Sequence, residues 1–148
     1  MSHIESVNVT ITDLNALKAA CTRLGVEFLE NKKTYNWFNF SVGDYPLPVG
    51  FTAKDLGKCE HAIKVPGVHY EIGVVPLKTG KGYTLLYDFY GSSGRHDGGK
   101  LKEKFGTGLT KLVDGYSIEA LKAKARAKGY MSQEKIVNGK THLVVTGF

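Results

Sequence analysis

The chain has 148 residues, 42% of them hydrophobic, with a net charge of +6, 18 Gly and 2 Cys. This size suits one domain spanning residues 1–148, and the hydrophobic fraction excludes a disordered protein. No apolar run approaches the ~18 residues of a membrane helix, no signal-peptide pattern opens the chain, and two cysteines are too few for a disulfide scaffold. We therefore expect a soluble cytoplasmic protein that does not bind membranes.

The first third of the chain reads as strand, helix and two further strands. Residues 7–11 alternate between apolar and polar side chains, which predicts a half-buried strand. Thr12 or Asp13 can cap the helix that follows, because a side-chain oxygen there accepts a backbone N–H, and Gly25 is a natural end for this helix. Further strands are expected at residues 26–29 and 34–42, the second rich in aromatic side chains.

The rest of the chain is predicted to hold three more strands, a helix and a hairpin. The Pro- and Gly-containing residues 43–57 favour a loop. A second helix is expected to begin at Ser117 and end at Gly129. Asn138-Gly139 predicts a tight hairpin turn, because both residues tolerate a positive φ. The strands are expected at 62–65, 68–75, 83–90, 134–137 and 140–145, and the buried face of the second helix at Ile118, Leu121 and Ala125.

Short turns between neighbouring strands predict an α+β fold, a mainly antiparallel sheet with two helices on one face. Residues 14–19 resemble residues 118–123, and a glycine follows both segments at the same offset. Duplicated β-α-β-β units, as in a ferredoxin-like fold, would explain this repeat, and so would the frequent use of Ala, Leu and Lys in helices. Because such sheets leave edge strands exposed, we also expect a homo-oligomer.

Several short segments carry a family resemblance. They are Met1-Ser2-His3, Asp13-Leu14-x-x-Leu17, Tyr70-Glu71-Ile72-Gly73, residues 83–91, residues 116–130 and Asn138-Gly139-Lys140. Across them the chain resembles the uncharacterised family of the hypothetical chloroplast reading frame thirty-five, found in plastids and cyanobacteria with relatives in bacteriophages. The family brings no established activity and no catalytic residues. The resemblance implies a small accessory or phage-encoded protein, which in the second case would work in the host cytoplasm.

Residues 91–111 are rich in glycine and in basic side chains. Glycines let backbone N–H groups converge on an anion, and Lys and Arg supply charge, so this segment favours anion or phosphate binding. A solvated connector is the other explanation, because glycines and charges also keep a loop soluble. The candidate ligand-binding residues are Tyr90, Ser92, Ser93, Arg95, His96, Lys100, Lys102 and Lys104.

Signatures of nucleotide hydrolysis or metal binding are incomplete. Gly94, Gly99 and Lys100 have the spacing of a P-loop, but Leu101 stands where Ser or Thr would hold Mg²⁺. His69 with Glu71 could hold a metal on one strand face, although a surface His–Glu pair is the more common case. Cys59 with His61 is a conceivable nucleophile pair that lacks an orienting group. We therefore expect no cofactor and no metal site.

Three functions remain open. The favoured one is a non-enzymatic binding protein that captures a small anionic, nucleotide-like ligand, such as a cyclic signalling nucleotide, which a phage would use to sequester a host signal. The first alternative is a nucleic-acid-binding accessory protein that uses the same positive charge. The second is a small phosphodiesterase-type enzyme or nucleotide hydrolase, for which His69, Glu71 and His96 are the available acid–base groups.

Overall fold

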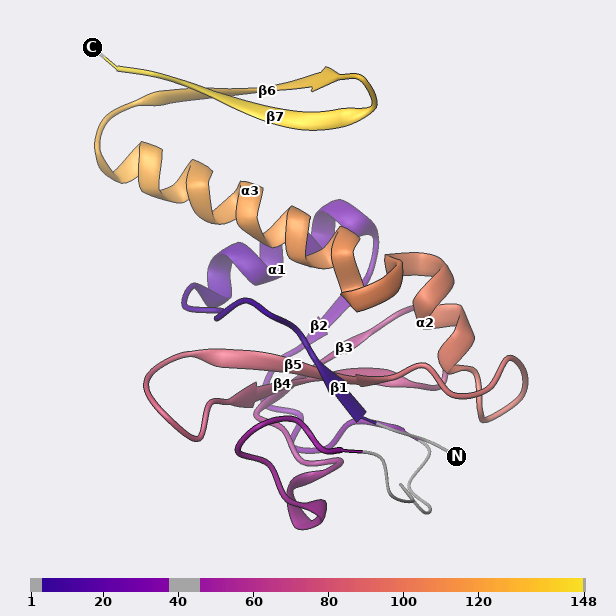
Figure 1. Ribbon diagram of the computed structural model, residues 1–148. Coiled ribbons are helices and arrows are strands. Elements are labelled where there is room, and N and C mark those ends of the chain that lie inside the picture. The colour runs from indigo at the N-terminus through magenta and orange to yellow at the C-terminus, as the bar shows by residue number, and fades with distance from the viewer. Residues whose placement is uncertain (1–3, 38–45, 148) are drawn as a thin grey trace.

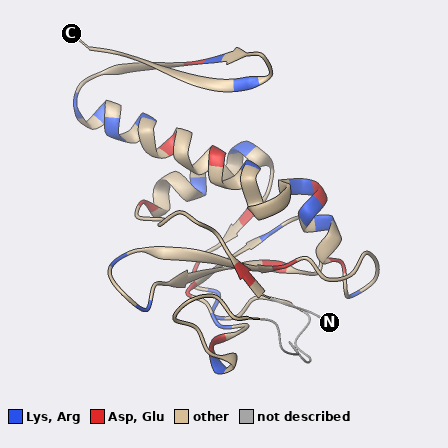
Figure 2. Ribbon diagram, viewed as in Figure 1, with Lys and Arg blue, Asp and Glu red and all other residues tan. Residues whose placement is uncertain are grey.

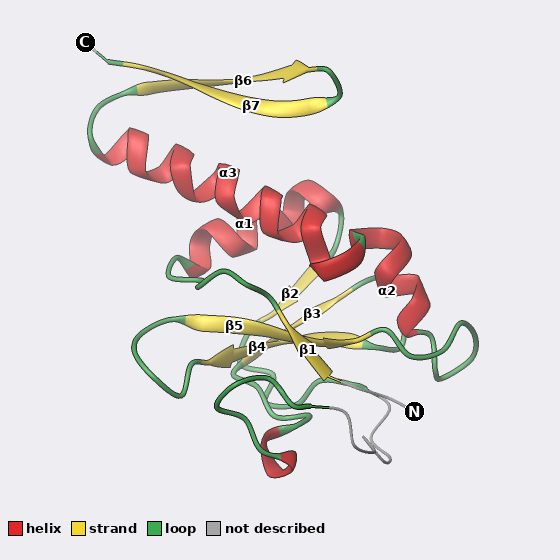
Figure 3. Ribbon diagram, in the orientation of Figure 1, coloured by secondary structure: helices red, strands yellow, loops and turns green. Residues whose placement is uncertain are grey.

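The computed structural model describes residues 4–37 and 46–147. It is an α+β fold in which a sheet, a layer of helices and a separate hairpin are stacked (Figures 1 and 3). The elements in chain order are β1 (Ile4–Ser6), α1 (Leu14–Leu24), β2 (Glu27–Leu29), β3 (His61–Lys64), β4 (Glu71–Pro76), β5 (Tyr83–Asp88), α2 (Gly98–Phe105), α3 (Thr110–Ala127), β6 (Met131–Val137) and β7 (Lys140–Thr146), with short 3₁₀ turns at Ala53–Asp55 and Thr107–Leu109.

The main sheet has five strands in the order β1-β5-β4-β3-β2, and every neighbouring pair is antiparallel. This confirms the mainly antiparallel sheet. Helix α1 connects β1 and β2, which are the two edge strands. Strands β6 and β7 form a two-stranded sheet of their own. The two strands after the second predicted helix therefore do not join the first sheet.

Both faces of the five-stranded sheet are covered. The helices α1, α2 and α3 bury one face, where Ile72 and Leu85 of the sheet meet Leu17, Phe105 and Leu112 of the helices. Described residues of the connection between β2 and β3 cover the opposite face. Because both faces are buried, β4 and β5 read as nearly continuous apolar runs rather than as clean alternation. The smaller core on this second face contains Tyr35, Phe51 and Leu56 packed with Ala62, Val75 and Leu86.

Helix α1 matches its predicted boundaries because local signals set both ends. The Asp13 carboxylate accepts the Ala16 N–H at 3.0 Å, and Gly25 ends the helix with a φ of 71°. Helix α3 also holds the N-terminal end of α1 in place through Tyr116. The Tyr116 hydroxyl oxygen accepts the backbone N–H groups of Thr12 and Asp13 at 2.9 and 3.2 Å. The first half of α3 is thereby tied to the start of α1.

Two predicted strands are wrong over much of their length. The first strand is β1 at residues 4–6, and within 7–11 only Ile11 forms an isolated bridge, with Tyr83. Of the predicted strand 34–42, Thr34 makes an isolated bridge with Lys58, and residues 35–37 are irregular. Residues 38–45 lie outside the described residues. The aromatic side chains of Tyr35 and Trp37 pack onto the second face of the sheet, which explains a strand-like composition without a strand.

The second predicted helix begins earlier in the structure than the sequence predicts. It starts at Thr110, and Ser117 lies inside it; it ends at Ala127, two residues before Gly129. Leu121, expected on the buried face, is 52% exposed. The buried residues of α3 lie mostly in its first half, where the helix packs on the core. They are Leu112, Gly115, Tyr116 and Ala125.

The C-terminal hairpin has the predicted turn. Asn138 and Gly139 both adopt positive φ, 52° and 76°, which confirms the tight turn. The hairpin lies beyond α3, on the side away from the sheet (Figure 1), and most of its residues are exposed. Glu134 anchors it through ion pairs with Arg23 and with Lys122. Among the described residues, no helix is long and apolar enough to cross a membrane.

Candidate functional site

The glycine-rich segment is a short loop followed by a helix. Residues 91–97 form the loop, in which Ser93 and His96 exchange two backbone hydrogen bonds of 3.2 Å. Helix α2 starts at Gly98, in a stretch that the sequence left without a helix. A Cβ at Gly98 would overlap the backbone carbonyl of Asp88. A glycine is needed at this position because the start of α2 passes directly over the end of β5.

The N–H groups at the start of α2 are already used within the protein. Gly98 donates to the Tyr90 carbonyl at 2.8 Å, and Gly99 donates to the Gly91 carbonyl at 2.6 Å. Lys100 donates to the Asp97 carbonyl at 2.9 Å. In a P-loop the corresponding N–H groups point at phosphate. Here a phosphate would have to displace these three backbone hydrogen bonds.

The structure separates the predicted ligand residues into two groups. Arg95 and His96 lie on the loop and Tyr90 directly precedes it, with the rings of Tyr90 and His96 edge to face at 6.2 Å between centroids. Ser92 and Ser93 are exposed on the same loop. The lysines lie along α2, where Lys100 and Lys102 are exposed and Lys104 is half-buried.

Arg95 and His96 line a small cavity between three segments of the chain. The segments are the irregular stretch before residue 38, the residues that lead into β4, and the loop 91–97. The cavity has a volume of about 240 Å³. It is lined by Asn36, Trp37, His69, Tyr70, Arg95 and His96. The pocket lined by these six residues is called the Trp37–Arg95 pocket below.

Asp97 holds two sides of this pocket together. Its side chain has no solvent exposure, and its two carboxylate oxygens accept the backbone N–H groups of His69 at 2.8 Å and Tyr70 at 3.0 Å. The ring Nδ1 of His69 lies 3.1 Å from Oδ2 of the same carboxylate. Burial raises the pKa of Asp97, but these hydrogen bonds outweigh it, and the net shift is downward. Asp97 is therefore a buried, ionised carboxylate at neutral pH.

A tyrosine–histidine pair forms part of the pocket wall. The Tyr70 hydroxyl lies 3.0 Å from Nδ1 of His96. Burial raises the pKa of Tyr70 above its usual value, and the negative charges of Asp88 and Asp97 raise it further. The phenol thus keeps its proton at neutral pH. When the His96 ring is neutral, the Tyr70 hydroxyl donates a hydrogen bond to Nδ1 of His96, so the proton of the His96 ring is on Nε2.

Glu71 does not act together with His69. Its buried carboxylate binds Lys32 Nζ at 2.5 and 2.6 Å and accepts the Asn36 N–H at 2.9 Å. This ion pair holds the stretch that carries Trp37 against β4. The interpretation of His69 and Glu71 as shared metal ligands is therefore not supported, and no group of three or more His, Cys, Asp or Glu is placed for a metal within residues 4–37 and 46–147.

Cys59 and His61 do not form a nucleophile pair. The Cys59 thiol donates to the Lys32 carbonyl at 3.1 Å, whereas Nδ1 of His61 accepts the Asn31 N–H at 2.9 Å. Burial raises the pKa of Cys59 to about 11, so it remains a protonated thiol at neutral pH. The structure therefore does not support the conceivable nucleophile pair of Cys59 and His61.

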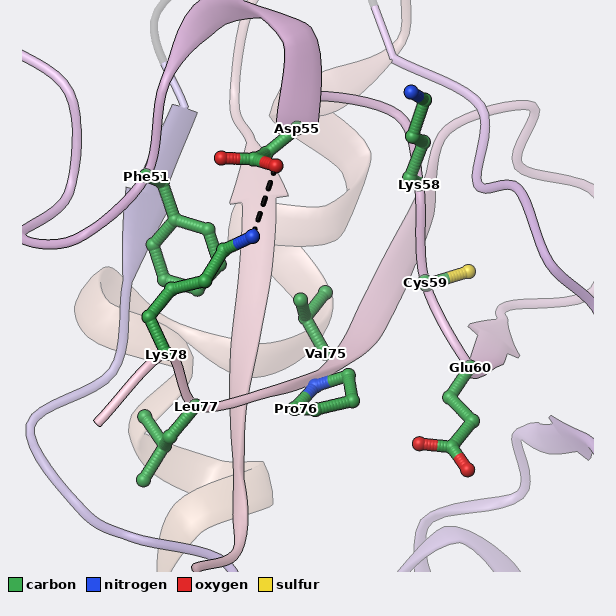
Figure 4. Close-up of a pocket in the computed structure, with 9 residues that line it drawn as sticks. All are labelled: Phe51, Asp55, Lys58, Cys59, Glu60, Val75, Pro76, Leu77 and Lys78. Carbon is green, nitrogen blue, oxygen red and sulfur yellow. Dashed lines mark hydrogen bonds and ion pairs between the residues drawn. The ribbon is translucent and has the colours of Figure 1, made fainter. Parts of the chain in front are cut away.

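Two of the larger cavities each contain one cation in an ion pair, beside lysines that make no ion pair with a described carboxylate. One, of about 410 Å³, lies on the second face of the sheet, where Lys78 and Asp55 form an ion pair of 3.0 Å (Figure 4). The other, of about 640 Å³, lies between α3 and the hairpin turn. Its Arg23 contacts Glu119 at 3.1 Å and also pairs with Glu134. The Trp37–Arg95 pocket differs because it is lined by an arginine, Arg95, that makes no ion pair with any described carboxylate.

Comparison with protein-family models, with curated proteins and with solved structures found no match for this chain.

Proposed function

We propose that the protein binds a small anionic, nucleotide-like ligand in the Trp37–Arg95 pocket. The observation that carries the proposal is Arg95, an exposed guanidinium at a pocket and without an ion-pair partner among the described residues. A guanidinium forms two parallel hydrogen bonds to phosphate, which makes it a strong recognition group for this anion. The favoured class of ligand from the sequence is kept, but the binding groups differ: they lie on the loop and its neighbours rather than along α2.

The other walls of the pocket suit a base or another flat ring. Trp37 offers an indole face or edge, and aromatic side chains beside a cationic group are the usual surface on which nucleobases stack. A volume of about 240 Å³ lies below the common range of ~300–1,000 Å³ for small-molecule sites. The pocket is therefore expected to enclose a phosphate and part of one base, with the remainder of the ligand in solvent.

Trp37 is the single tryptophan of the chain, and it lines this pocket and a neighbouring cavity of about 370 Å³. Its fluorescence therefore reports on ligand binding, and the Arg95→Ala variant shows which of the two sites is occupied. Titration with adenosine monophosphate and with a cyclic mononucleotide should change the tryptophan fluorescence. The variant Arg95→Ala should weaken binding about 10-fold to 100-fold, because a hydrogen bond to a charged group contributes about 1.5–3 kcal/mol.

Two controls match this variant. Arg126→Ala removes an exposed arginine of α3, and Lys100→Ala removes an exposed cation of the glycine-rich segment outside the pocket. Both should bind as the unmodified protein does. Equal affinity of the Arg95→Ala variant, or equal losses in all three variants, would contradict binding at the Trp37–Arg95 pocket.

Nucleic-acid binding is the second candidate. Lys and Arg residues occur along α2 and α3, with Asp and Glu among them (Figure 2). The exposed basic residues at the end of α3 and directly after it include Lys124, Arg126 and Lys128. Binding through such a surface depends steeply on salt and tolerates long strands. If single-stranded DNA binds more tightly than a mononucleotide, and Arg126→Ala rather than Arg95→Ala weakens it, this second function is favoured.

A further inference from the structure

His69 has a defined tautomer because of its contact with Asp97. Each oxygen of the Asp97 carboxylate accepts a backbone N–H group, from His69 and from Tyr70. The ionised carboxylate has no proton to donate, so it is also the acceptor in its contact with the His69 ring. The Nδ1 of His69, 3.1 Å away, must therefore carry the proton and donate it. In the neutral ring, the lone pair is then on Nε2. A buried carboxylate that orients an imidazole in this way is a recurrent arrangement for a general base.

The His69 side chain lines the pocket and is largely open to solvent. The His69 side chain is 62% exposed, whereas Asp97 beneath it is fully buried. His69 lines the same cavity as Arg95, whose guanidinium can neutralise charge that develops on phosphoryl oxygens. A general base and a cation that binds phosphate thus lie on one small pocket.

We infer that the Trp37–Arg95 pocket cleaves a phosphodiester that carries a neighbouring hydroxyl, as a ribonucleotide linkage does, with His69 as the general base. This inference rests on the proposed binding of a nucleotide-like ligand in the same pocket. A hydroxyl of the substrate is the expected nucleophile because it is already held next to the phosphorus, and such intramolecular attack has a large rate advantage over attack by free water.

The cleavage needs only the substrate, His69 and protons from solvent. His69 Nε2 takes the proton of the 2′-hydroxyl while the 2′-oxygen forms a bond to phosphorus. The bond from phosphorus to the 5′-oxygen breaks, and this oxygen leaves with the electron pair and takes a proton from solvent. The products are a 2′,3′-cyclic phosphate and a 5′-hydroxyl, and the proton on His69 returns to solvent. Asp97 is a positioning residue here, because it acts only through His69.

The test uses the full-length protein and uridylyl-3′,5′-adenosine, with its 2′-deoxy analogue for comparison. The fluorescence of Trp37 reports binding, and chromatography of the products reports cleavage. Both compounds should bind, and only the ribonucleotide should be cleaved. His69→Gln should lower the cleavage rate by about 100-fold or more, since general-base catalysis contributes about 10²–10⁴-fold, with binding changed less than about 3-fold. His142→Gln, at an exposed position of β7, should retain full activity.

A separate readout tests the role of Asp97. Nitrogen-15 NMR of the imidazole rings should show His69 with its proton on Nδ1, and Asp97→Asn should shift this tautomer and lower cleavage. If the dinucleotide binds without cleavage, or His69→Gln cleaves as fast as the unmodified protein, the inference is wrong and the binding function stands. If neither compound changes the fluorescence and neither is cleaved, both proposals fail.

Discussion

At the scale of single residues, Asp97 links the loop 91–97 to the entrance of β4. One buried carboxylate accepts three hydrogen bonds there, two from backbone N–H groups and one from the His69 ring. Asp97 precedes α2 as its N-cap, yet its side chain makes no capping hydrogen bond to that helix. The Asp97 carboxylate therefore serves the contact between two segments rather than the helix that follows it.

Replacing Asp97 with Asn should lower the free energy of unfolding by about 2 kcal/mol at pH 7, because hydrogen bonds to a charged group are lost or weakened. The folded pKa of Asp97 is lowered, so its ionised form is favoured by folding. This stabilisation is complete above the unfolded pKa of ~3.9 and is lost as the pH falls through the lower folded pKa. Urea unfolding between pH 7 and pH 3 should show a gap between the two proteins that narrows at the acid end. A constant gap would contradict this role.

At the scale of elements, predictability followed the range of the signals. Helix α1 was predicted correctly because Asp13 and Gly25 mark its ends locally. Helix α2 and the first turns of α3 were missed because glycines within 98–115 argue against a helix. Those helices form through burial of Leu101, Phe105 and Leu112 against the sheet, which is a tertiary effect.

The candidate site was predictable only in part. Arg95 and His96 stand out as polar residues beside glycines, so the sequence nominates them. The contact of Asp97 with residues 69 and 70 joins positions 27 and 28 residues apart, and nothing in the local pattern points to it. Trp37 was expected in a strand, and its place in the pocket depends on the Lys32–Glu71 ion pair. Pairing across the fold cannot be read from spacing alone.

Replacing two helical glycines with alanine should have opposite effects on stability. Neither Gly98 nor Gly115 has a positive φ, and alanine is the better helix former by about 1 kcal/mol. At Gly115 the added Cβ would meet the Ala20 methyl at an ordinary 3.6 Å, so Gly115→Ala should be neutral or stabilise by up to about 1 kcal/mol. At Gly98 the Cβ would overlap backbone atoms of β5 and the residues that follow it, so Gly98→Ala should destabilise by about 1–3 kcal/mol.

Thermal or urea unfolding of the two variants gives the comparison. An equal change in the free energy of unfolding in the two variants would contradict close packing of the start of α2 on β5.

At the scale of the whole molecule, the hairpin is set apart from the rest of the fold. The sheet is buried between α1–α3 and the segment that precedes β3, whereas β6 and β7 expose apolar side chains. These side chains include Met131, Ile136, Val137, Val144 and Val145. A two-stranded hairpin is only marginally stable in water by itself. Its stability depends on contacts with the helices, such as the ion pairs of Glu134 with Arg23 of α1 and Lys122 of α3.

Hydrogen exchange should separate these two parts. The amides of β6 and β7 should exchange faster than those of β4 and β5, since opening the hairpin exposes little buried surface. Glu134→Gln should increase this difference by weakening exposed ion pairs, each worth about 0.2–1 kcal/mol. Protection of the hairpin that rises with protein concentration would be evidence for the homo-oligomer that the sequence predicts. Equal protection in the hairpin and the sheet of a dilute sample would contradict this account.

The placement of β1 and β2 at opposite edges of the sheet has a consequence for how the protein reaches its native state. Ile4 pairs with Asp88, so the partner strand of β1 is synthesised more than half a chain later than β1 itself. Closing so long a loop is slow, whereas β3, β4 and β5 are neighbours in sequence and can pair early. During translation, β1 therefore remains unpaired until β5 has emerged from the ribosome. Chains that stop before Tyr83 would leave both β1 and α1 without the surface on which they pack, which makes premature termination products of this protein prone to aggregation.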